Sequence, residues 1–177
     1  MYWFSRRPDR EARPTRGSAR PSLAEITDSM LIGEYPRACD IEWLATEQRV
    51  TAILNLQDDE DLRINGLEIA ELHEVCDRHG VTLVRSSIHD GSADDMAARL
   101  VAALTALDEL IRSGRRVYVH CNAGINRAPT LAIAYLRAHG GLSLNEAMAH
   151  VKRRRACGPF MTVLEEHFGS RDLKPTK

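Results

Sequence analysis

The sequence predicts an α/β fold in which a central, mostly parallel sheet of four to five strands is flanked by helices on both faces. Short apolar runs alternate with segments of helical periodicity from Ser22 onward, and strands that are separated by helices pair in parallel. The 177 residues suffice for one domain. The longest apolar runs, such as residues 131–136, are far shorter than the roughly 18 residues of a membrane-spanning helix. No membrane span is therefore expected.

Four short apolar segments have the length and composition of buried strands. They are residues 30–33, 50–56, 81–85 and 116–120. Ligands of a parallel sheet bind at the carboxyl ends of its strands, so functional residues are expected directly after these segments.

Five segments are predicted to be helical. They are residues 40–48, 66–79, 92–111 and 127–140, and a helix that begins at 143. Asp40 caps the first helix, and Gly80 stops the second as a C-cap. Ser92 and Ser143 each begin a capping box with an acidic residue three positions later.

The N-terminal segment differs in composition from the remainder of the chain. Residues 1–21 hold six arginines and two acidic residues, a local charge of +4, whereas the remainder carries −5. This segment is rich in Arg, Pro, Ser and Gly and lacks periodicity, which predicts a flexible arm over 1–21, a folded domain over 22–170 and a tail over 171–177. An acidic folded body is a poor electrostatic match for nucleic acid, so no such partner is expected.

The four cysteines, Cys39, Cys76, Cys121 and Cys157, show neither a C-x-x-C pair nor the histidine spacing of a zinc site. Arginines 6–7 are like the start of a twin-arginine export signal, but polar residues follow where an apolar stretch should stand. The sequence therefore predicts a cytoplasmic protein with reduced thiols. Cys76 and Cys157 are interpreted as packing residues, and a redox partner for Cys121 stays open.

The chemically informative residues follow the fourth predicted strand. The segment HCNAGINR, residues 120–127, stands between that strand and a helix N-terminus and contains Cys-x5-Arg. Backbone N–H groups of such a loop can surround a phosphate, and the helix end adds positive potential. This field stabilises a thiolate at Cys121, Arg127 can hold two phosphoryl oxygens, and Gly124 lets the backbone approach the ligand. A thiolate beneath a bound phosphate favours in-line attack on phosphorus.

The alternative interpretation is an inert, buried Cys121 and an ordinary surface Arg127, because this spacing occurs often by chance. His120, Gly124 and the flanking strand and helix favour the catalytic interpretation. The predicted phosphate-binding loop consists of Asn122, Ala123, Gly124, Ile125, Asn126 and Arg127.

These residues resemble the signature H-C-x-x-G-x-x-R of the cysteine-dependent dual-specificity phosphatases. The resemblance covers about residues 26–165, which makes 22–170 the expected catalytic domain. Segments 53–57, 117–124 and 127–129 are similar to stretches of the glucan phosphatases, the plant starch phosphatases among them. Low-molecular-weight tyrosine phosphatases and arsenate reductases carry the cysteine near the N-terminus, and rhodaneses have a shorter loop, so these families fit worse.

A phosphatase of this kind needs an acid to protonate the leaving oxygen. In the resembling family this acid is an aspartate on a loop well before the cysteine, and Asp90 stands 31 residues before Cys121. Asp94 and Asp95 are alternatives, although carboxylates are common in a first helical turn for capping reasons alone. Asp90 is the predicted general acid, and His89 is interpreted as a loop side chain.

Two further features belong to the neighbourhood of the motif. His120 is expected to order the loop from behind rather than to act as a catalyst. The basic run 152–155 is either a solvated helix end or a source of positive potential beside the loop.

The chain departs from the family pattern at several positions. Most dual-specificity phosphatases have Ser or Thr directly after the arginine, where a hydroxyl helps the thiolate to leave, but this chain has Ala128, as the plant glucan phosphatases do. The glucan phosphatases have Gly before the arginine, where this chain has Asn126. They also carry aromatics that stack on sugar rings, and the corresponding places here are Gly91 and residues 62–65. The missing aromatics argue against a glucan substrate.

The sequence therefore predicts a phosphomonoester hydrolase in which Cys121, Arg127 and Asp90 are catalytic and His120 and Ala128 support the loop. A phosphoprotein is the preferred substrate, with phosphotyrosine first and phosphoserine or phosphothreonine in addition. Two alternatives stay open, namely the same chemistry on a phosphoglucan, phosphoinositide or other small molecule, and a phosphate-binding pseudophosphatase. A monomer without metal or organic cofactor is expected, because thiolate, acid and water suffice.

Overall fold

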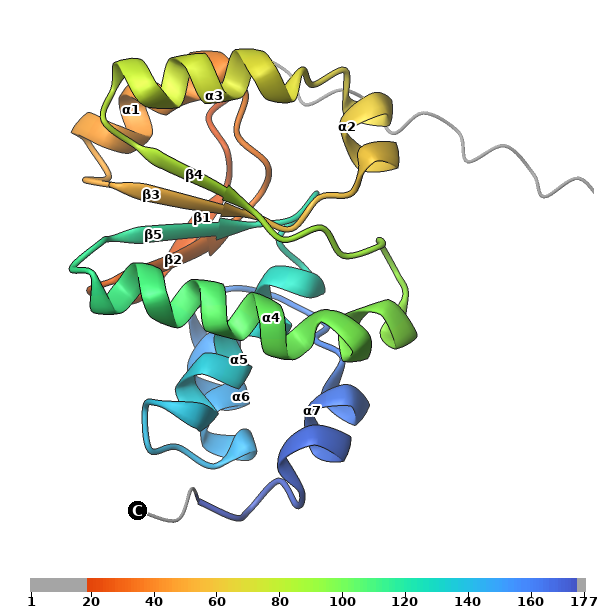
Figure 1. The fold of residues 1–177 in the computed structure, drawn as a ribbon. Coiled ribbons are helices and arrows are strands. Elements are labelled where there is room, and N and C mark those ends of the chain that lie inside the picture. The colour runs from red at the N-terminus through yellow and green to blue at the C-terminus, as the bar shows by residue number, and fades with distance from the viewer. Residues whose placement is uncertain (1–18, 175–177) are drawn as a thin grey trace, which may run out of the picture.

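The computed structural model describes residues 19–174. Its centre is a five-stranded sheet in the order β1-β2-β5-β3-β4, which lies between two layers of helices (Figure 1). Four strands are parallel and one edge strand, β1, is antiparallel to β2. The strands are β1 (Leu23–Thr27), β2 (Met30–Gly33), β3 (Ala52–Asn55), β4 (Thr82–Arg85) and β5 (Val117–His120). The predicted α/β class is confirmed.

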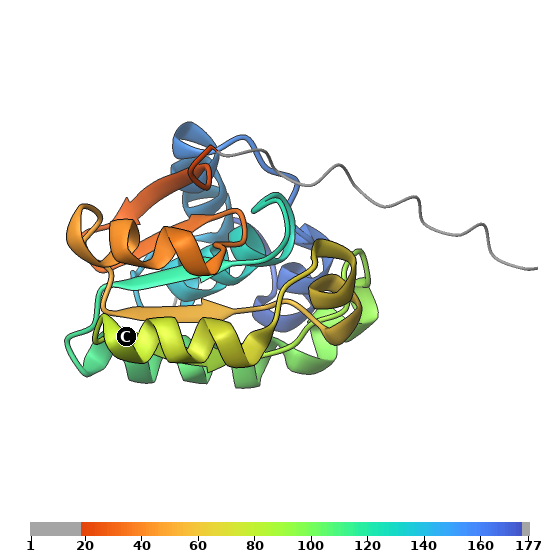
Figure 2. The same ribbon diagram turned by 90° about the horizontal axis from the view of Figure 1, so that it is seen from above.

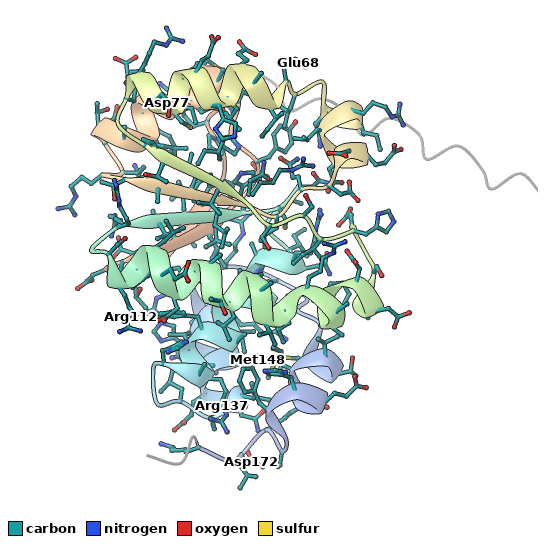
Figure 3. The ribbon with its side chains drawn as sticks, in the orientation of Figure 1. Glu68, Asp77, Arg112, Arg137, Met148 and Asp172 are labelled. Atoms are coloured by element: carbon teal, nitrogen blue, oxygen red, sulfur yellow. The ribbon has the colours of Figure 1, made fainter. Side chains whose placement is uncertain are left out.

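Alternate residues of the central strands face opposite helical layers, because side chains of a strand point to its two faces in turn. Val117 and Val119 of β5 pack into the larger core, whereas Tyr118 packs into the smaller one. Helices α4 (Ala93–Arg112), α5 (Arg127–Ala138), α6 (Leu144–Arg154) and α7 (Met161–Phe168) cover the first face, and α1 (Ile41–Thr46) and α3 (Ile69–Arg78) cover the second. Figure 2 shows α1 and α3 side by side over the sheet. In Figure 3, Asp77 on α3 and Met148 on α6 mark the two layers.

The predicted helix over 66–79 is wrong at its start. The structure has two helices in this region, α2 (Asp59–Asn65) and α3, and Gly66 ends the first with a left-handed φ of 62°. Asp58 and Asp61 form a reciprocal capping box that begins α2. Helix α2 buries only Asp61 and Leu62, so it lacks the apolar periodicity by which a helix is found in a sequence.

Two of the predicted caps differ in detail from the structure. Asp40 precedes α1, but its carboxylate accepts a hydrogen bond from the Arg37 backbone N–H (2.9 Å) rather than from that helix. Ser92 Oγ accepts from the Asp95 N–H (3.1 Å), while the Asp95 carboxylate accepts from the His89 N–H (2.7 Å). The second bond ties the start of α4 to the loop before it. The capping box that begins α6 is confirmed.

The predicted N-terminal arm over 1–21 lies almost entirely outside the described residues, as does the end of the predicted tail. The domain boundaries therefore stay a prediction. None of the helices in residues 19–174 combines the length and the hydropathy that crossing a bilayer requires.

The registers of the parallel strands bring their carboxyl ends to one edge of the sheet. His120 at the end of β5 pairs with Gly33 of β2 and with Asn55 of β3, and Asn55 pairs in turn with Arg85 of β4. The segments that follow these strands, together with α2, therefore lie on the same side of the molecule (Figure 1).

Candidate active site

The predicted phosphate-binding loop connects β5 directly to the first residue of α5. Cys121 is 3% exposed, whereas Ile125 at the outer turn of the loop is exposed. Gly124 has a φ of +65°, and a Cβ at this position would lie 2.5 Å from the Gly33 carbonyl carbon. The glycine is therefore required by the close approach of the β2 backbone as well as by its own conformation.

Arg127 is fully buried, and one end of its guanidinium is anchored. Nη1 donates to Asp61 Oδ2 (2.6 Å), to the Ile88 carbonyl (2.7 Å) and to the Leu56 carbonyl (3.3 Å). Nε and Nη2 are buried and donate no hydrogen bond within residues 19–174, and Nη2 lies 3.0 Å from Asp90 Oδ1. This edge of the guanidinium can hold two oxygens of an oxyanion beside Asp90.

Of the three candidate acids, the structure brings Asp90 to the loop. Its Oδ1 lies 3.0 Å from Arg127 Nη2 in a largely buried ion pair. Asp94 is exposed in the first turn of α4, and Asp95 is bonded to Arg99 Nε (2.9 Å) and to the His89 N–H. The backbone bond from His89 lowers the pKa of Asp95, which keeps that carboxyl ionised. His89 itself is exposed and pairs through Nδ1 with Asp58 (2.6 Å).

A buried polar network behind the loop was not found by sequence analysis. Asn122 Nδ2 donates to Asp61 Oδ1, and its Oδ1 accepts from Gln57 Nε2 (2.7 Å) and Asn65 Nδ2 (3.0 Å). Asp61 is only 2% exposed and contacts Asn122 and Arg127 at once. The capping box at the start of α2 is the one local signal that could have drawn attention to Asp61.

The negative groups around Arg127 counteract the effect of burial on its pKa. Burial by itself would lower the pKa of Arg127, but the Cys121 thiolate, the bonded Asp61 and the nearby Asp90 outweigh it and raise that pKa. The guanidinium therefore stays charged at the bottom of the site.

His120 ends β5 directly before the loop and is fully buried. Its Nδ1 is 3.3 Å from the Cys121 carbonyl oxygen. Burial, with a smaller contribution from the Arg127 charge, lowers the pKa of His120 to about 3. The imidazole is therefore neutral at physiological pH and adds no charge to the site.

Asn126 and Ala128, where the sequence departs from the family pattern, have different surroundings in the structure. Asn126 has φ −110° and ψ −74°, a conformation that needs no glycine, and its Nδ2 donates to the Gly158 carbonyl (2.8 Å). Ala128 is fully buried. The nearby Thr130 hydroxyl donates to the Asn126 carbonyl (2.7 Å) and accepts from the Phe160 N–H (2.9 Å), so its hydrogen bonds are already committed.

The basic run divides between solvent and the loop. Lys152, Arg153 and Arg154 are exposed at the end of α6, whereas Arg155 contacts the loop. Beside the loop lies a hollow of about 380 Å³. It is lined by Ser22, Leu23, Glu34, Ala123, Ile125, Arg154, Arg155 and Ala156.

The remaining cysteines pack as predicted. Cys76 is buried in the smaller core, where burial raises its pKa to about 12, and Cys157 packs against the larger core. Both thiols and that of Cys39 are free.

Comparison with known proteins agrees with this geometry. Residues 31–166 match the family model of the dual specificity phosphatase catalytic domain. The chain is 28% identical over 137 residues to the chloroplastic phosphoglucan phosphatase LSF1 of Arabidopsis thaliana, covering 77% of this chain and 23% of that protein. It is 28% identical over 145 residues to dual specificity protein phosphatase 5 of Rattus norvegicus, covering 82% of this chain and 33% of that protein. The chain thus spans about a quarter to a third of the length of these relatives.

Solved structures give the same answer for the fold. The active form of Tk-PTP superposes with a TM-score of 0.70 at 28% identity and covers 82% of this chain and 95% of that one. PTPMT1, at 24% identity, shares the fold with a TM-score of 0.67, covering 82% and 92% of the two chains. With its Cys-x5-Arg loop between β5 and α5 and a family match over residues 31–166, this chain belongs to the dual-specificity phosphatases, a family of cysteine-dependent phosphatases.

Proposed function

We propose that the protein hydrolyses phosphomonoesters of proteins through a phosphocysteine intermediate, with Cys121 as nucleophile, Arg127 as oxyanion ligand and Asp90 as general acid. The observation that carries this proposal is the position of the Asp90 carboxyl, whose Oδ1 lies 3.0 Å from Arg127 Nη2. A carboxyl at this atom is within reach of the ester oxygen of a phosphate held by the same arginine.

In the first step, the Cys121 thiolate attacks phosphorus in line with the leaving oxygen. The S–P bond forms as the P–O ester bond breaks, and Asp90 gives its proton to the leaving oxygen, which departs as an alcohol or phenol. Arg127 and the N–H groups of residues 122–127 hold the charge that develops on the three other oxygens.

In the second step, the Asp90 carboxylate takes a proton from water, and the resulting oxygen attacks phosphorus. The P–S bond breaks, the Cys121 thiolate is restored, inorganic phosphate is released and Asp90 is again protonated. Over the two steps one water is consumed, and both Cys121 and Asp90 return to their starting states.

Three observations favour a phosphoprotein over a sugar. Gly91, next to Asp90, is exposed and has no side chain to stack on a sugar ring. On α2, Arg63 is paired with Glu60 (2.6 Å), and Asn65 is bonded within the network behind the loop. The hollow beside the loop is lined by polar, charged and aliphatic side chains and contains no aromatic residue. This environment suits a peptide better than a sugar chain, so phosphotyrosine is the proposed first substrate, with phosphoserine and phosphothreonine in addition.

The experiment that tests the proposed chemistry is the substitution Cys121→Ser. It should abolish turnover of p-nitrophenyl phosphate, because a hydroxyl near its normal pKa is a far poorer nucleophile than a thiolate. Binding of inorganic phosphate should persist, because the N–H groups and Arg127 are unchanged. Residual turnover above a few per cent of wild type would place the nucleophile elsewhere.

A phosphoglucan is the second candidate substrate, favoured by the similarity to plant phosphoglucan phosphatases. Initial rates measured side by side on phosphotyrosine peptide, phosphoserine peptide, phosphorylated amylopectin and phosphoinositides separate the candidates. The proposal expects phosphotyrosine peptide to be the fastest. Release of phosphate from amylopectin at the same rate would overturn the preference for protein.

A further inference from the structure

Arg155, the C-cap residue that follows α6, binds the outer side of the phosphate-binding loop. Its Nε donates to the Gly124 carbonyl and its Nη2 donates to the Ala123 carbonyl, both at 2.8 Å. The third nitrogen, Nη1, donates to Ser22 Oγ (3.1 Å). One half-buried guanidinium therefore holds two consecutive peptide groups of the loop.

The neighbouring carbonyls of the loop are also held from outside. The Asn122 carbonyl accepts from the Tyr35 N–H (3.1 Å), and the Ile125 carbonyl accepts from the Gly158 N–H (2.9 Å). Every carbonyl from residue 122 to 125 thus accepts a hydrogen bond from a donor outside the loop.

The corresponding N–H groups have no acceptor. Within residues 19–174, no hydrogen bond uses the backbone N–H groups of residues 122–126. In a planar trans peptide, the C=O of one residue and the N–H of the next point in opposite directions. A bond that holds the Ala123 carbonyl outward therefore directs the Gly124 N–H inward, and the bond to the Gly124 carbonyl directs the Ile125 N–H inward.

We propose that Arg155 is a positioning residue for the phosphate site, which acts by fixing these two peptide groups so that their N–H groups face the bound oxyanion. This inference rests on the proposed function of the loop. Arg155 touches the loop carbonyls, and its effect on the substrate passes through the backbone.

The geometry distinguishes this role from a general electrostatic one. Two different nitrogens of a planar fork serve two successive carbonyls, and an ammonium on a flexible stem cannot reproduce that pair of contacts. The substitution Arg155→Lys therefore keeps the charge but loses the paired contact. If positive potential alone mattered, lysine would suffice.

Arg153, two residues earlier on α6, is the matched control. It is exposed. Within the described residues it neither lines the hollow nor makes a hydrogen bond to the loop. Its removal changes the local charge by the same amount.

The experiment measures inhibition by inorganic phosphate and by orthovanadate, together with kcat, KM and Tm, for Arg155→Met, Arg155→Lys and Arg153→Met. Both Arg155 variants should raise the inhibition constants and lower kcat/KM by about tenfold or more, since each loses at least one charge-assisted bond to the loop. Arg153→Met should stay within about twofold of wild type, the range of a solvent-screened surface charge. Tm should change little in all three, which separates loop geometry from global stability.

Wild-type inhibition constants in Arg155→Lys would overturn the inference in favour of a charge effect, and wild-type constants in Arg155→Met would remove any role for this residue. If Arg155→Met does not fold, Arg155→Lys decides the question by the same criterion.

Arg127→Ala separates this inference from the proposed function. If phosphate binding survives Arg127→Ala, the proposed site itself is wrong. If it is lost there but retained in both Arg155 variants, only the positioning role fails.

Discussion

The Asp90 carboxyl lies beside Arg127 Nη2, which is the position that its proposed role requires. Asp90→Asn should lower kcat by roughly 10²- to 10⁴-fold, because an amide cannot protonate the leaving oxygen. The loss should be larger for an alkyl phosphate than for p-nitrophenyl phosphate, whose leaving group needs little protonation. Steady-state rates on the two substrates measure this difference. Asp94→Asn, an exposed carboxyl four residues later, is the control and should be silent. The reverse pattern would mean that Asp94 is the acid.

With Ala128, the departing thiolate lacks the hydroxyl that is usual in the family. The Thr130 hydroxyl cannot replace that group, because it already bonds to the Asn126 carbonyl and the Phe160 N–H. One hydrogen bond to a charged group contributes about 1.5 to 3 kcal/mol, which corresponds to about a ten- to hundredfold slower second step. Phosphoenzyme should therefore accumulate, and rapid mixing with p-nitrophenyl phosphate should show a burst of nitrophenolate. Ala128→Ser should raise kcat and shrink the burst. A wild-type enzyme without a burst, and with no response to this substitution, would mean that another group stabilises the leaving thiolate.

At the scale of elements, α2 connects the sheet edge to Arg127 through Asp61. Asp61→Asn should destabilise the protein by about 3 kcal/mol, because it leaves a buried guanidinium with one carboxylate fewer. It should also weaken phosphate binding, since Nη1 of Arg127 loses its shortest anchor. Urea unfolding and phosphate inhibition measure the two effects. Asp59→Asn on the same helix is the control, because the Asp59 side chain is 93% exposed and pairs with Arg85 at the surface. Equal effects of the two substitutions would exclude a special role for Asp61.

The same element marks the limit of sequence analysis. The loop could be predicted because its cysteine, glycine and arginine lie within one short segment between a strand and a helix. Asp61 and Arg155 could not, because each reaches the loop from an element distant in the chain, and their contacts exist only after the sheet is assembled. The edge strand β1 and helix α7 were also missed, and β1 contains only one fully buried residue, Ile26. Asp90 lies between these cases, because its spacing from Cys121 suggested it while its contact with Arg127 required the fold.

At the scale of the whole molecule, His120 links stability to pH. Its pKa of about 3 in the fold lies below the ordinary value of 6.5, first because of burial. Below pH 6.5 His120 is protonated in the unfolded chain but stays neutral in the native state. The free energy of unfolding therefore decreases as the pH falls toward 3. The slope is about 1.4 kcal/mol per pH unit, or about 2 kcal/mol between pH 6.5 and 5.

Urea unfolding of wild type and His120→Asn at pH 7 and pH 5 checks this dependence. The variant should lose about 2 kcal/mol less than wild type over this interval, whatever its absolute stability. His73→Asn, at an exposed position on α3, is the control and should follow wild type. Parallel loss in wild type and His120→Asn would contradict a neutral His120 in the native state.

The bonds between the loop and the segment after α6 bear on the order of events during synthesis. The whole Cys-x5-Arg segment and all five strands leave the ribosome before residues 155–158, which supply the outer bonds to the carbonyls of residues 123–125. A nascent chain that ends after α5 therefore holds Cys121 and Arg127 on an incompletely bonded loop. These bonds can form only after the segment that follows α6 has emerged, so the geometry of the loop is completed late in the synthesis of this domain.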